Sequence, residues 1–324
     1  MALKLIDRLG RKLNYVRISV TDRCNYRCRY CMPEEGVEWI PHDKIMTYEE
    51  IRLLIQLLME LGVKKVRLTG GEPFVRKGFA QLLQTLRQSF PALELAVTTN
   101  ASLLSKYIDE IKDLGLRLNV SLDTLDAEKF RFITRIGNLN EVIEGITLWS
   151  CLKLPLKINT VLIKGFNEEE AMSLADLAKK MGATLRFIEF MPLDEGLWSR
   201  DSFISASTIE NLLFSSGDWK MAEETPSATD GPAKYYVNSK TGQKIGIIAA
   251  VTHHFCDSCN RLRITATGEM KNCLFAAGGF DLLSPLRKGD LEEVKRRILT
   301  AAWEKPANWK KLVPGDSHMS QIGG

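Results

Sequence analysis

The feature that most constrains the fold is a regular alternation of strand-like and helix-like segments between residues 15 and 190. The strand-like segments, which are rich in β-branched and aromatic residues, are 15–20, 64–70, 94–100, 117–123, 156–163 and 184–190. The helix-like segments between them are 47–61, 79–90, 102–115, 140–149 and 167–182. The first of these opens with Thr47 and Glu50 in the spacing of a capping box.

Alternation of this kind is typical of βαβ units with a parallel sheet. The sequence therefore predicts an α/β fold, a partial (βα)6 TIM-like barrel over residues 1–190, with a doubly wound open sheet as the alternative. Residues 191–235 are rich in Gly and Pro, and strand-like runs follow at 235–238 and 244–251, then a helical pattern at 291–305. We expect 191–324 to be a C-terminal extension packed against the barrel.

The predicted strands carry an unusual polar face. Within each strand, alternation places apolar residues on one face and polar residues on the other. The polar faces hold one acid, Asp123, and five basic residues, namely Arg17, Lys65, Arg67, Lys157 and Arg186. The inner strand faces of a filled barrel would be apolar, and unpaired cations are not stable in a dry interior. We therefore predict an open interior that binds an anionic ligand with phosphate groups. The alternative is a solvent-exposed sheet face.

Three cysteines follow the first predicted strand in the spacing C-x3-C-x2-C, at Cys24, Cys28 and Cys31. A [4Fe–4S] cubane usually has four thiolate ligands. Three thiolates can bind three of its irons and leave the fourth iron open for chemistry. A structural zinc site would need a fourth ligand, for which His42 has poor spacing. The iron–sulfur interpretation is therefore favoured.

A second group of three cysteines, Cys256, Cys259 and Cys273, lies in the C-terminal region. His253 and His254 precede it and could complete a zinc site, which is the usual interpretation of an isolated segment of this kind. Arg261 and Arg263 alternate between the cysteines and add two cations that point one way. The presence of the first group shifts the balance toward a second cluster.

Composition excludes few classes of function. The net charge is +4 over 324 residues, which does not indicate a nucleic-acid-binding protein. No apolar run reaches the length that spans a bilayer, and the first residues lack the core of a signal peptide. We therefore expect a cytoplasmic protein without nucleic-acid or membrane partners, which agrees with clustered thiols serving metal or redox chemistry.

The first cysteine group, with Tyr30 before its last cysteine, resembles the radical S-adenosylmethionine superfamily. The segment "TGGEP" at 69–73 resembles the motif of that superfamily that meets the methionine amino group. Two glycines at a strand exit also let the backbone approach a ligand closely. The resemblance implies that the open iron binds S-adenosylmethionine, which is cleaved reductively to a 5′-deoxyadenosyl radical.

The motifs from both ends of the chain, taken together, narrow the resemblance from the superfamily to one family. "RISVTDRCNYRCRYCMP", "RLTGGEP", "GPAKYY" and "HHFCDSCNRLR…CLF" together resemble the GTP 3′,8-cyclase family of molybdenum cofactor biosynthesis, from about residue 15 to the C-terminus. This resemblance implies two [4Fe–4S] clusters, of which the second binds the guanine of GTP. It also implies that the radical abstracts the ribose 3′ hydrogen, and that 3′,8-cyclo-7,8-dihydro-GTP passes to a cyclic pyranopterin monophosphate synthase.

The resemblance also implies residue roles. The positions that match S-adenosylmethionine contacts are Tyr30, Gly71, Ser121 and Met191. The positions that match GTP contacts are Arg17, Lys65, Arg67, Thr98, Lys157, Arg186, Arg261 and Arg263; Asn260 is a weaker candidate for the purine. Five of these are the basic residues already placed on the polar strand faces by alternation. Region 1–190 would thus be the radical barrel, and 191–324 the auxiliary-cluster and GTP-binding region.

The C-terminal Gly323 and Gly324 would commonly be a frayed tail. The resemblance implies instead that they enter the active site and, with Arg17, take part in catalysis. Ala101 stands where the family commonly has Gly, which affects only the turn after the third predicted strand. Cys151 matches nothing and is predicted to be a buried apolar residue.

Two alternatives remain open at this point. One is another radical S-adenosylmethionine enzyme with an auxiliary cluster that modifies peptides or RNA. The other is a non-enzymatic interaction module with two zinc sites. The sequence leaves the oligomeric state open, a homodimer included.

Overall fold

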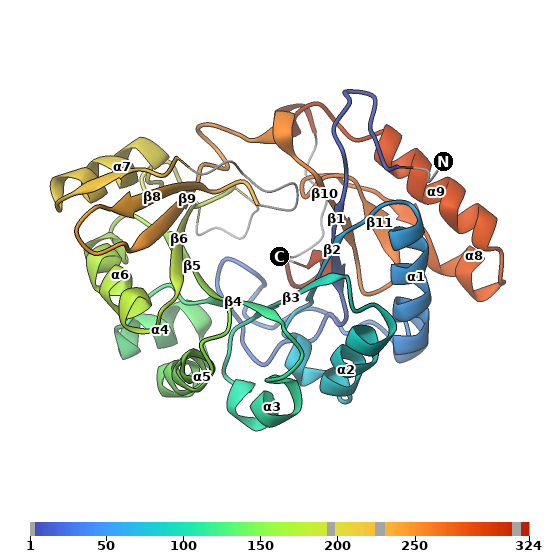
Figure 1. Ribbon diagram of the computed structural model, residues 1–324, viewed down its shortest axis with the longest axis horizontal. Coiled ribbons are helices and arrows are strands. Elements are labelled where there is room, and N and C mark those ends of the chain that lie inside the picture. Colours follow the sequence, from blue (N-terminus) through green and yellow to red (C-terminus); the bar gives the residue numbers. More distant parts are fainter. Residues whose placement is uncertain (1–3, 193–197, 224–230, 313–318, 324) are drawn as a thin grey trace. The chain divides into compact units, whose positions relative to one another are not determined.

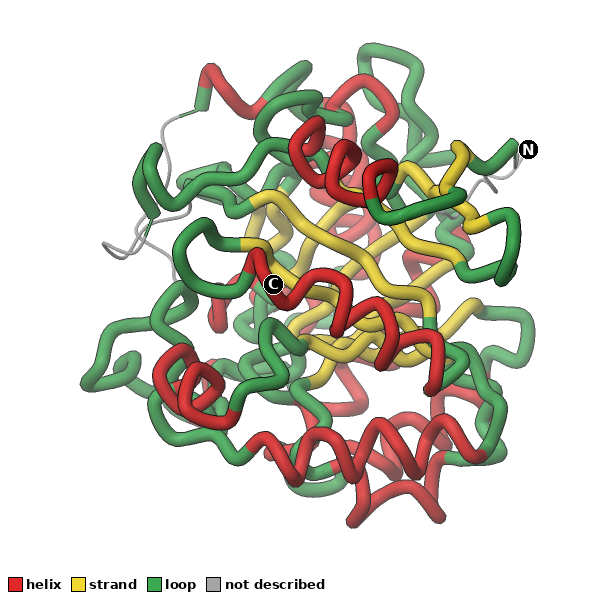
Figure 2. The backbone as a smooth tube through the Cα atoms, turned by 90° about the vertical axis from the view of Figure 1, so that its left-hand side faces the viewer, coloured by secondary structure: helices red, strands yellow, loops and turns green. Residues whose placement is uncertain are grey.

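The computed structural model describes most of the chain, namely residues 4–192, 198–223, 231–312 and 319–323. The chain divides into two compact units, each assembled from separate stretches of sequence. The first unit consists of Met1–Asn25, Glu35–Thr98 and Cys256–Gly324. The second consists of Tyr26–Glu34 and Thr99–Phe255. Figure 1 labels most of their helices and strands, and Figure 2 distinguishes the two kinds of element by colour.

The first unit is built on strands in the order β12-β11-β10-β1-β2-β3. Their bounds are β1 (Tyr15–Ser19), β2 (Lys65–Thr69), β3 (Glu94–Thr99), β10 (Arg261–Ile264), β11 (Glu269–Lys271) and β12 (Phe280–Asp281). The pairs β10–β1, β1–β2 and β2–β3 are parallel, and β11 and β12 continue antiparallel from β10. Every residue of β1 and β2 is buried, so their polar face is buried as well as their apolar face.

The helices of the first unit are α1 (Tyr48–Glu60), α2 (Phe79–Ser89), α8 (Leu283–Arg287), α9 (Leu291–Trp303) and α10 (Met319–Ile322), with 3-10 turns at His42–Lys44, Pro73–Val75, Cys256–Ser258 and Trp309–Lys311. The predicted capping box at the start of α1 is confirmed, because Thr47 accepts from the Glu50 N–H and Glu50 accepts from the Thr47 N–H. Helix α1 buries residues 51, 54, 55, 57 and 58, of which 51, 54, 55 and 58 have the spacing of one helix face.

The second unit repeats the plan of the first. Its strands lie in the order β4-β5-β6-β9-β8-β7. Their bounds are β4 (Arg117–Ser121), β5 (Leu156–Leu162), β6 (Thr184–Glu189), β7 (Trp219–Met221), β8 (Lys234–Asn238) and β9 (Lys244–Ile248). The pairs β4–β5, β5–β6 and β6–β9 are parallel, whereas β8 and β7 continue antiparallel from β9. Each unit thus joins three consecutive strands to a parallel fourth strand from the C-terminal region.

The helices of the second unit are α3 (Leu104–Ile111), α4 (Ala127–Thr134), α5 (Leu139–Cys151), α6 (Ala171–Lys180) and α7 (Ala206–Ser215), with a 3-10 turn at Glu168–Glu170. The prediction that Cys151 is buried is wrong, because this cysteine is exposed. Helix α5 buries a face that contains Ile146 and Trp149. At about 100° per residue, a position two residues after Trp149 lies away from that face.

All six predicted parallel strands and the five predicted helices between them are present, as are the later strands β8 and β9 and helix α9. The α-helices and strands outside the predicted segments are helices α4, α7, α8 and α10 and strands β7, β10, β11 and β12. Ala101 has a φ of 64°, the left-handed region that favours glycine, which locates the departure from the family pattern in the turn after β3. Within the described residues no helix is long and apolar enough to cross a membrane.

Candidate functional site

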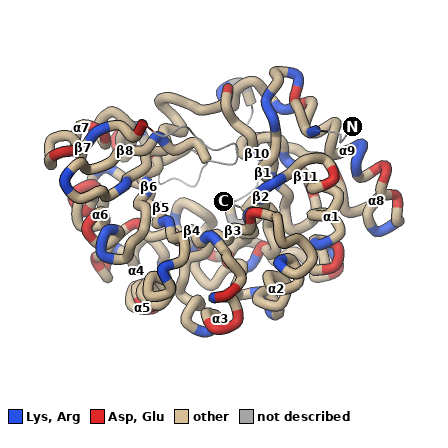
Figure 3. Tube along the Cα trace, viewed as in Figure 1, with Lys and Arg blue, Asp and Glu red and all other residues tan. Residues whose placement is uncertain are grey.

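Three arginines form one row across neighbouring strands of the first unit. The parallel register places Arg17 of β1 opposite both Arg263 of β10 and Arg67 of β2. Paired strands lie about 4.8 Å apart, so the three side chains leave the same sheet face close to one another. Each arginine is at most 9% exposed. Figure 3 marks the Lys and Arg positions of these strands in blue.

Two arginines of this row have buried donor atoms without hydrogen-bond partners among the described residues. These atoms are the Nε atoms of Arg17 and Arg67. Burial, and after it the charge of Arg263, holds the pKa of Arg17 well below its usual value. Burial and then Arg261 lower the pKa of Arg263 to about 10. Uncompensated buried cations cost free energy, so the row is suited to an anion with several charged oxygens.

A second row lies one pleat away on the same face. The register places Tyr15 between Arg261 and Lys65, and Lys65 opposite Glu94. The Nζ atom of Lys65 lies 2.6 Å from Oε1 of Glu94. The expectation of a single acid on the polar faces is therefore wrong: Glu94 alternates with Thr98 on β3 and compensates Lys65. Thr98 itself has a buried hydroxyl without a hydrogen-bond partner among the described residues.

Tyr15 is a residue that the sequence analysis missed. It is 2% exposed, and its ring centroid lies 5.2 Å from Nζ of Lys65 and 5.5 Å from Cζ of Arg67. Burial alone would raise the pKa of this phenol, but Arg67, Arg17, Lys65 and Arg261 together lower it to about 8. The available signal was its alternation with Arg17 and Ser19, since residues 15, 17 and 19 share one strand face.

Replacing Tyr15 with phenylalanine is expected to cost stability in a pH-dependent way. The folded-state pKa of about 8 lies below the ordinary value of 10.0. The tyrosinate therefore adds stability, on the order of 2 kcal/mol, that is fully present above about pH 10 and is lost as the pH falls through about 8. Melting curves of wild type and Tyr15→Phe should diverge between about pH 7 and pH 9.5. A constant difference over that range would contradict this assignment.

The C-terminal segment lies over the same face of the first unit. The Gly323 carbonyl accepts a 2.6 Å hydrogen bond from Nη1 of Arg263. Gly323 has a φ of 72°, and a Cβ placed on it would lie 2.7 Å from Cγ2 of Thr69. Glycine is therefore required at this position both by backbone angle and by space. Gly324, the other tail residue of the prediction, lies outside the described residues.

The two glycines after β2 pack closely against the loop that follows β1. A Cβ on Gly71 would lie 2.3 Å from the carbonyl oxygen of Arg23, and one on Gly70 would lie 2.7 Å from that of Thr21. The Gly71 N–H donates to the Thr21 carbonyl at 2.8 Å. Close backbone approach is thus made to the chain itself, where it fixes the segment that leads into Cys24.

The second cysteine group lies in the first unit. Cys256 is the first residue of a 3-10 turn that ends just before Cys259, and Cys273 follows β11. The three half-buried thiols are near enough for their charges to interact. Burial raises the pKa of Cys256, whereas at Cys259 the charges of Arg261 and Lys305 overcome burial and lower the pKa to about 6. Soft thiolates beside cations fit an iron–sulfur cluster.

No three His, Cys, Asp or Glu side chains in the described ranges converge as the ligands of one metal ion. A cubane does not require this convergence, because each thiolate binds a different iron. The donor set of three cysteines, with their thiols free of disulfides, therefore remains suited to a [4Fe–4S] cluster.

In the second unit, the segment Tyr26–Glu34 carries Cys28 and Cys31. The Cys31 N–H donates to the Cys28 carbonyl at 2.9 Å, which closes a turn between the two thiols. Helix α4 holds this segment: the Arg29 N–H donates to the Ile133 carbonyl at 2.9 Å, and its Nε donates to the Phe132 carbonyl at 2.8 Å. The loop that presents these cysteines is therefore anchored on a rigid element.

Tyr30 is fixed by a buried carboxylate. Its hydroxyl donates to Oδ2 of Asp123 at 2.6 Å, and the Val161 N–H donates to Oδ1 at 2.8 Å. Burial raises the pKa of Asp123 to about 6, although both hydrogen bonds oppose the rise. Ser121 ends β4 two residues before Asp123, and Met191 follows β6; both are half-buried.

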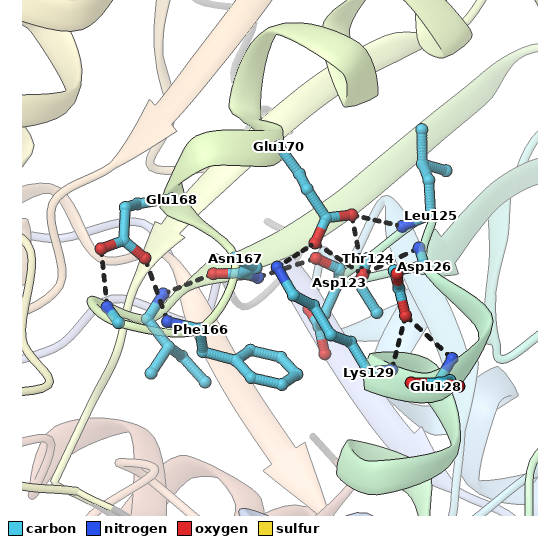
Figure 4. A network of polar contacts seen from close by, with 12 residues as sticks. Asp123, Thr124, Leu125, Asp126, Glu128, Lys129, Phe166, Asn167, Glu168 and Glu170 are labelled. Atoms are coloured by element: carbon cyan, nitrogen blue, oxygen red, sulfur yellow. Dashed lines mark hydrogen bonds and ion pairs between the residues drawn. The ribbon is translucent and has the colours of Figure 1, made fainter.

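A polar network beside Asp123 fixes the turn after β4 (Figure 4). Nδ2 of Asn167 donates to the Asp123 carbonyl at 2.7 Å. Glu170 accepts from the Thr124 hydroxyl and from the Leu125 N–H, and Lys129 lies 3.0 Å from the same carboxylate. The network thereby fixes the turn that carries Asp123, the hydrogen-bond partner of Tyr30.

The two predicted cations of the second unit have partners. Arg186 of β6 donates through Nε to Asn159 at 2.9 Å and through Nη2 to Asn119 at 2.6 Å. Lys157 of β5 donates to the Tyr235 hydroxyl at 3.1 Å. A Cβ on Gly246 would lie within 3.0 Å of both Arg186 and Tyr235, so this glycine makes room for them. Two amides and a phenol thus orient these cations.

Comparison with known proteins identifies the families and relatives that this chain resembles. The Radical SAM superfamily matches residues 18–178, and the family Molybdenum Cofactor Synthesis C matches residues 183–311. A GTP 3′,8-cyclase from Peptoclostridium acidaminophilum is 44% identical over 99% of this chain and 98% of the relative. One from Thermodesulfovibrio yellowstonii is 39% identical over 98% of this chain and 99% of the relative.

Solved structures agree at the level of the fold. Streptococcus suis SuiB bound to S-adenosylmethionine has a TM-score of 0.60 at 15% identity, over 81% of this chain and 60% of the SuiB chain. SuiB bound to the precursor peptide SuiA has a TM-score of 0.63 at 12% identity, over 94% of this chain and 68% of that chain. The predicted α/β fold class is confirmed. On the strength of its full-length relatives, the chain belongs to the GTP 3′,8-cyclase family.

Proposed function

We propose that this chain is a radical S-adenosylmethionine enzyme that converts GTP to 3′,8-cyclo-7,8-dihydro-GTP in molybdenum cofactor biosynthesis. The observation that carries the proposal is the buried arginine row of Arg263, Arg17 and Arg67, with Gly323 bonded to one end of it. Family membership favours this activity over peptide or RNA modification and over a module with two zinc sites.

Two [4Fe–4S] clusters and S-adenosylmethionine are the cofactors of this enzyme. Cys24, Cys28 and Cys31 would hold the first cluster, and the second would be held by Cys256, Cys259 and Cys273. The first cluster, when bound, supplies the electron that cleaves S-adenosylmethionine to a 5′-deoxyadenosyl radical. Tyr30, Gly71, Ser121 and Met191 are proposed to position S-adenosylmethionine. Tyr30 suits this role because Asp123 fixes its ring.

The triphosphate of GTP would meet the cationic residues. Arg17 and Arg67 carry buried donor atoms without hydrogen-bond partners among the described residues, so an anion there would satisfy them and relieve their mutual repulsion. Arg261, Arg263, Lys65 and Thr98 are proposed as further GTP contacts in the first unit, and Lys157 and Arg186 in the second. The protein contributes by orienting the ribose and excluding water rather than by new covalent chemistry.

The tail residues Gly323 and Gly324, with Arg17, are proposed to take part in catalysis. Support comes from Gly323, whose carbonyl is bonded to Arg263 and whose backbone lies against Thr69. We propose a division of labour near residue 190, with the radical chemistry in 1–190 and the second cluster and GTP binding in 191–324. A cytoplasmic location, a homodimer and delivery of the product to a cyclic pyranopterin monophosphate synthase complete the proposal.

The test is anaerobic incubation of the reconstituted protein with S-adenosylmethionine, dithionite and GTP, followed by mass analysis of nucleotides. We expect 5′-deoxyadenosine and a cyclised nucleotide in equal amounts. Formation of 5′-deoxyadenosine without any product derived from GTP would refute the assignment and leave a radical enzyme with a different substrate.

Replacing Cys273 with alanine is expected to halve the iron content. Anaerobically reconstituted wild type should hold about eight irons per chain and no zinc, and the variant about four, because the first cysteine group is intact. Cys151→Ala is the matched control, since this cysteine is exposed and belongs to neither group. Iron content and absorbance measure the outcome. Zinc in the wild type, or full iron in Cys273→Ala, would contradict the two-cluster assignment.

A further inference from the structure

Two buried cations connect separate stretches of the first unit around the second cysteine group. Lys305, which follows helix α9, is 3% exposed, and Arg11, from the N-terminal loop, is 8% exposed. Neither residue belongs to the proposed GTP contacts or cluster ligands. Burial of an ammonium is costly unless its hydrogen bonds are made, so each cation must be held by specific acceptors.

The acceptors of Lys305 are main-chain carbonyls next to the cysteines. Its Nζ atom donates to the Asn272 carbonyl at 2.6 Å and to the Arg261 carbonyl at 2.9 Å. Asn272 directly precedes Cys273, and Arg261 follows Cys259 by two residues. An ammonium has three donors, and these two carbonyls accept from two of them. Lys305 also lies near enough to Cys259 and Cys273 for their charges to interact.

Arg11 holds the main-chain carbonyls of Cys256, the remaining cysteine, and of Lys305. Its Nη1 atom donates to the Cys256 carbonyl at 2.6 Å, and Nη2 donates to the Lys305 carbonyl at 3.3 Å and to the Pro306 carbonyl at 2.8 Å. The buried carboxylate of Asp7 accepts from Nε and orients the guanidinium. A buried cation therefore holds a main-chain carbonyl at or near each of the three cysteines. The carbonyl is that of the cysteine itself for Cys256, that of the preceding residue for Cys273, and that of the second residue after it for Cys259.

We propose that Arg11 and Lys305 are positioning residues for the second cysteine group, and that the charge of Lys305 raises the reduction potential of the cluster held there. The cluster itself rests on the proposed function. A fixed positive charge at low dielectric favours the reduced, more negative state of a cluster, and charge and hydrogen bonds around the thiolates are known determinants of potential. The carbonyls that these two cations hold also fix the two segments that carry the cysteines.

The test compares Lys305→Met with Lys305→Arg and with Lys310→Met. Lys310 is an exposed lysine five residues away, so its replacement removes the same charge without touching the carbonyls. Iron content and a redox titration followed by electron paramagnetic resonance are measured on reconstituted protein without S-adenosylmethionine or GTP. These readouts do not depend on cyclase activity, and a wild type with zinc or about four irons would identify failure of the cluster assignment instead.

We expect Lys305→Met either to lose about half of the iron or to retain it with a second cluster of lower potential, while the first cluster titrates as in wild type. Lys305→Arg, which keeps the charge and the donors, should recover most of the lost iron or potential. The proposal is overturned if Lys305→Met matches Lys310→Met in both iron content and potential. It is also overturned if Lys305→Arg is as defective as Lys305→Met.

Discussion

Replacing Gly323 with alanine is expected to lower the rate of GTP cyclisation on the order of 100-fold, the loss typical of a reacting group displaced by about 1 Å. A methyl group at this position would lie 2.7 Å from Thr69, and the φ of 72° is unfavourable for any residue with a Cβ. The segment would have to move, and its hydrogen bond from Arg263 would be lost. Product formation under single-turnover conditions measures the effect.

The matched control for this variant is Gly278→Ala. Gly278 lies in the same unit, has open space around its Cα and has no positive φ, so the substitution adds the same methyl group without a clash. It should cyclise GTP at the wild-type rate. A Gly323→Ala enzyme that kept full activity would show that the C-terminal segment can leave the arginine row without consequence.

Replacing Arg17 with methionine is expected to have opposite effects on stability and on binding. Without GTP, Arg17 is a buried cation whose pKa is held down by burial and by Arg263, so its removal should raise the melting temperature. With GTP, loss of a charge-assisted hydrogen bond should weaken binding by roughly 10- to 100-fold. Thermal melts of the ligand-free protein and calorimetric titration with GTP measure the two quantities.

The control is Arg8→Met. Arg8 is exposed in the same unit, so its replacement removes the same charge from the surface. It should change neither quantity appreciably. A fall in melting temperature of Arg17→Met would mean that Arg17 is structurally paired, and unchanged GTP affinity would remove it from the binding site.

Much of the fold could be predicted because the signals are local. Strand β5 alternates buried and half-buried residues along its length, as alternation around Lys157 predicts. The start of α1 follows from side chains three residues apart at Thr47 and Glu50. Helix α4 was missed, although it has a local signal in the cap formed by Asp126, which accepts from the Glu128 and Lys129 N–H groups.

The rest of the candidate site depends on contacts between distant segments. The parallel pairing of β10 with β1, which completes the arginine row, joins residues more than 240 positions apart and has no local signal. Glu94 lies at a strand end, where its partner Lys65 becomes apparent only from the register. Lys305 follows a helix and looks like an ordinary surface lysine until Arg261 and Asn272 are seen to accept from it.

The central claim is that this chain generates a radical that takes the ribose 3′ hydrogen of GTP. It is tested most directly with GTP carrying deuterium at that carbon, incubated anaerobically with the reconstituted enzyme, dithionite and unlabelled S-adenosylmethionine. The account predicts that the 5′-deoxyadenosine formed carries one deuterium and accumulates together with the cyclised nucleotide. Unlabelled 5′-deoxyadenosine accompanied by unchanged GTP would contradict it.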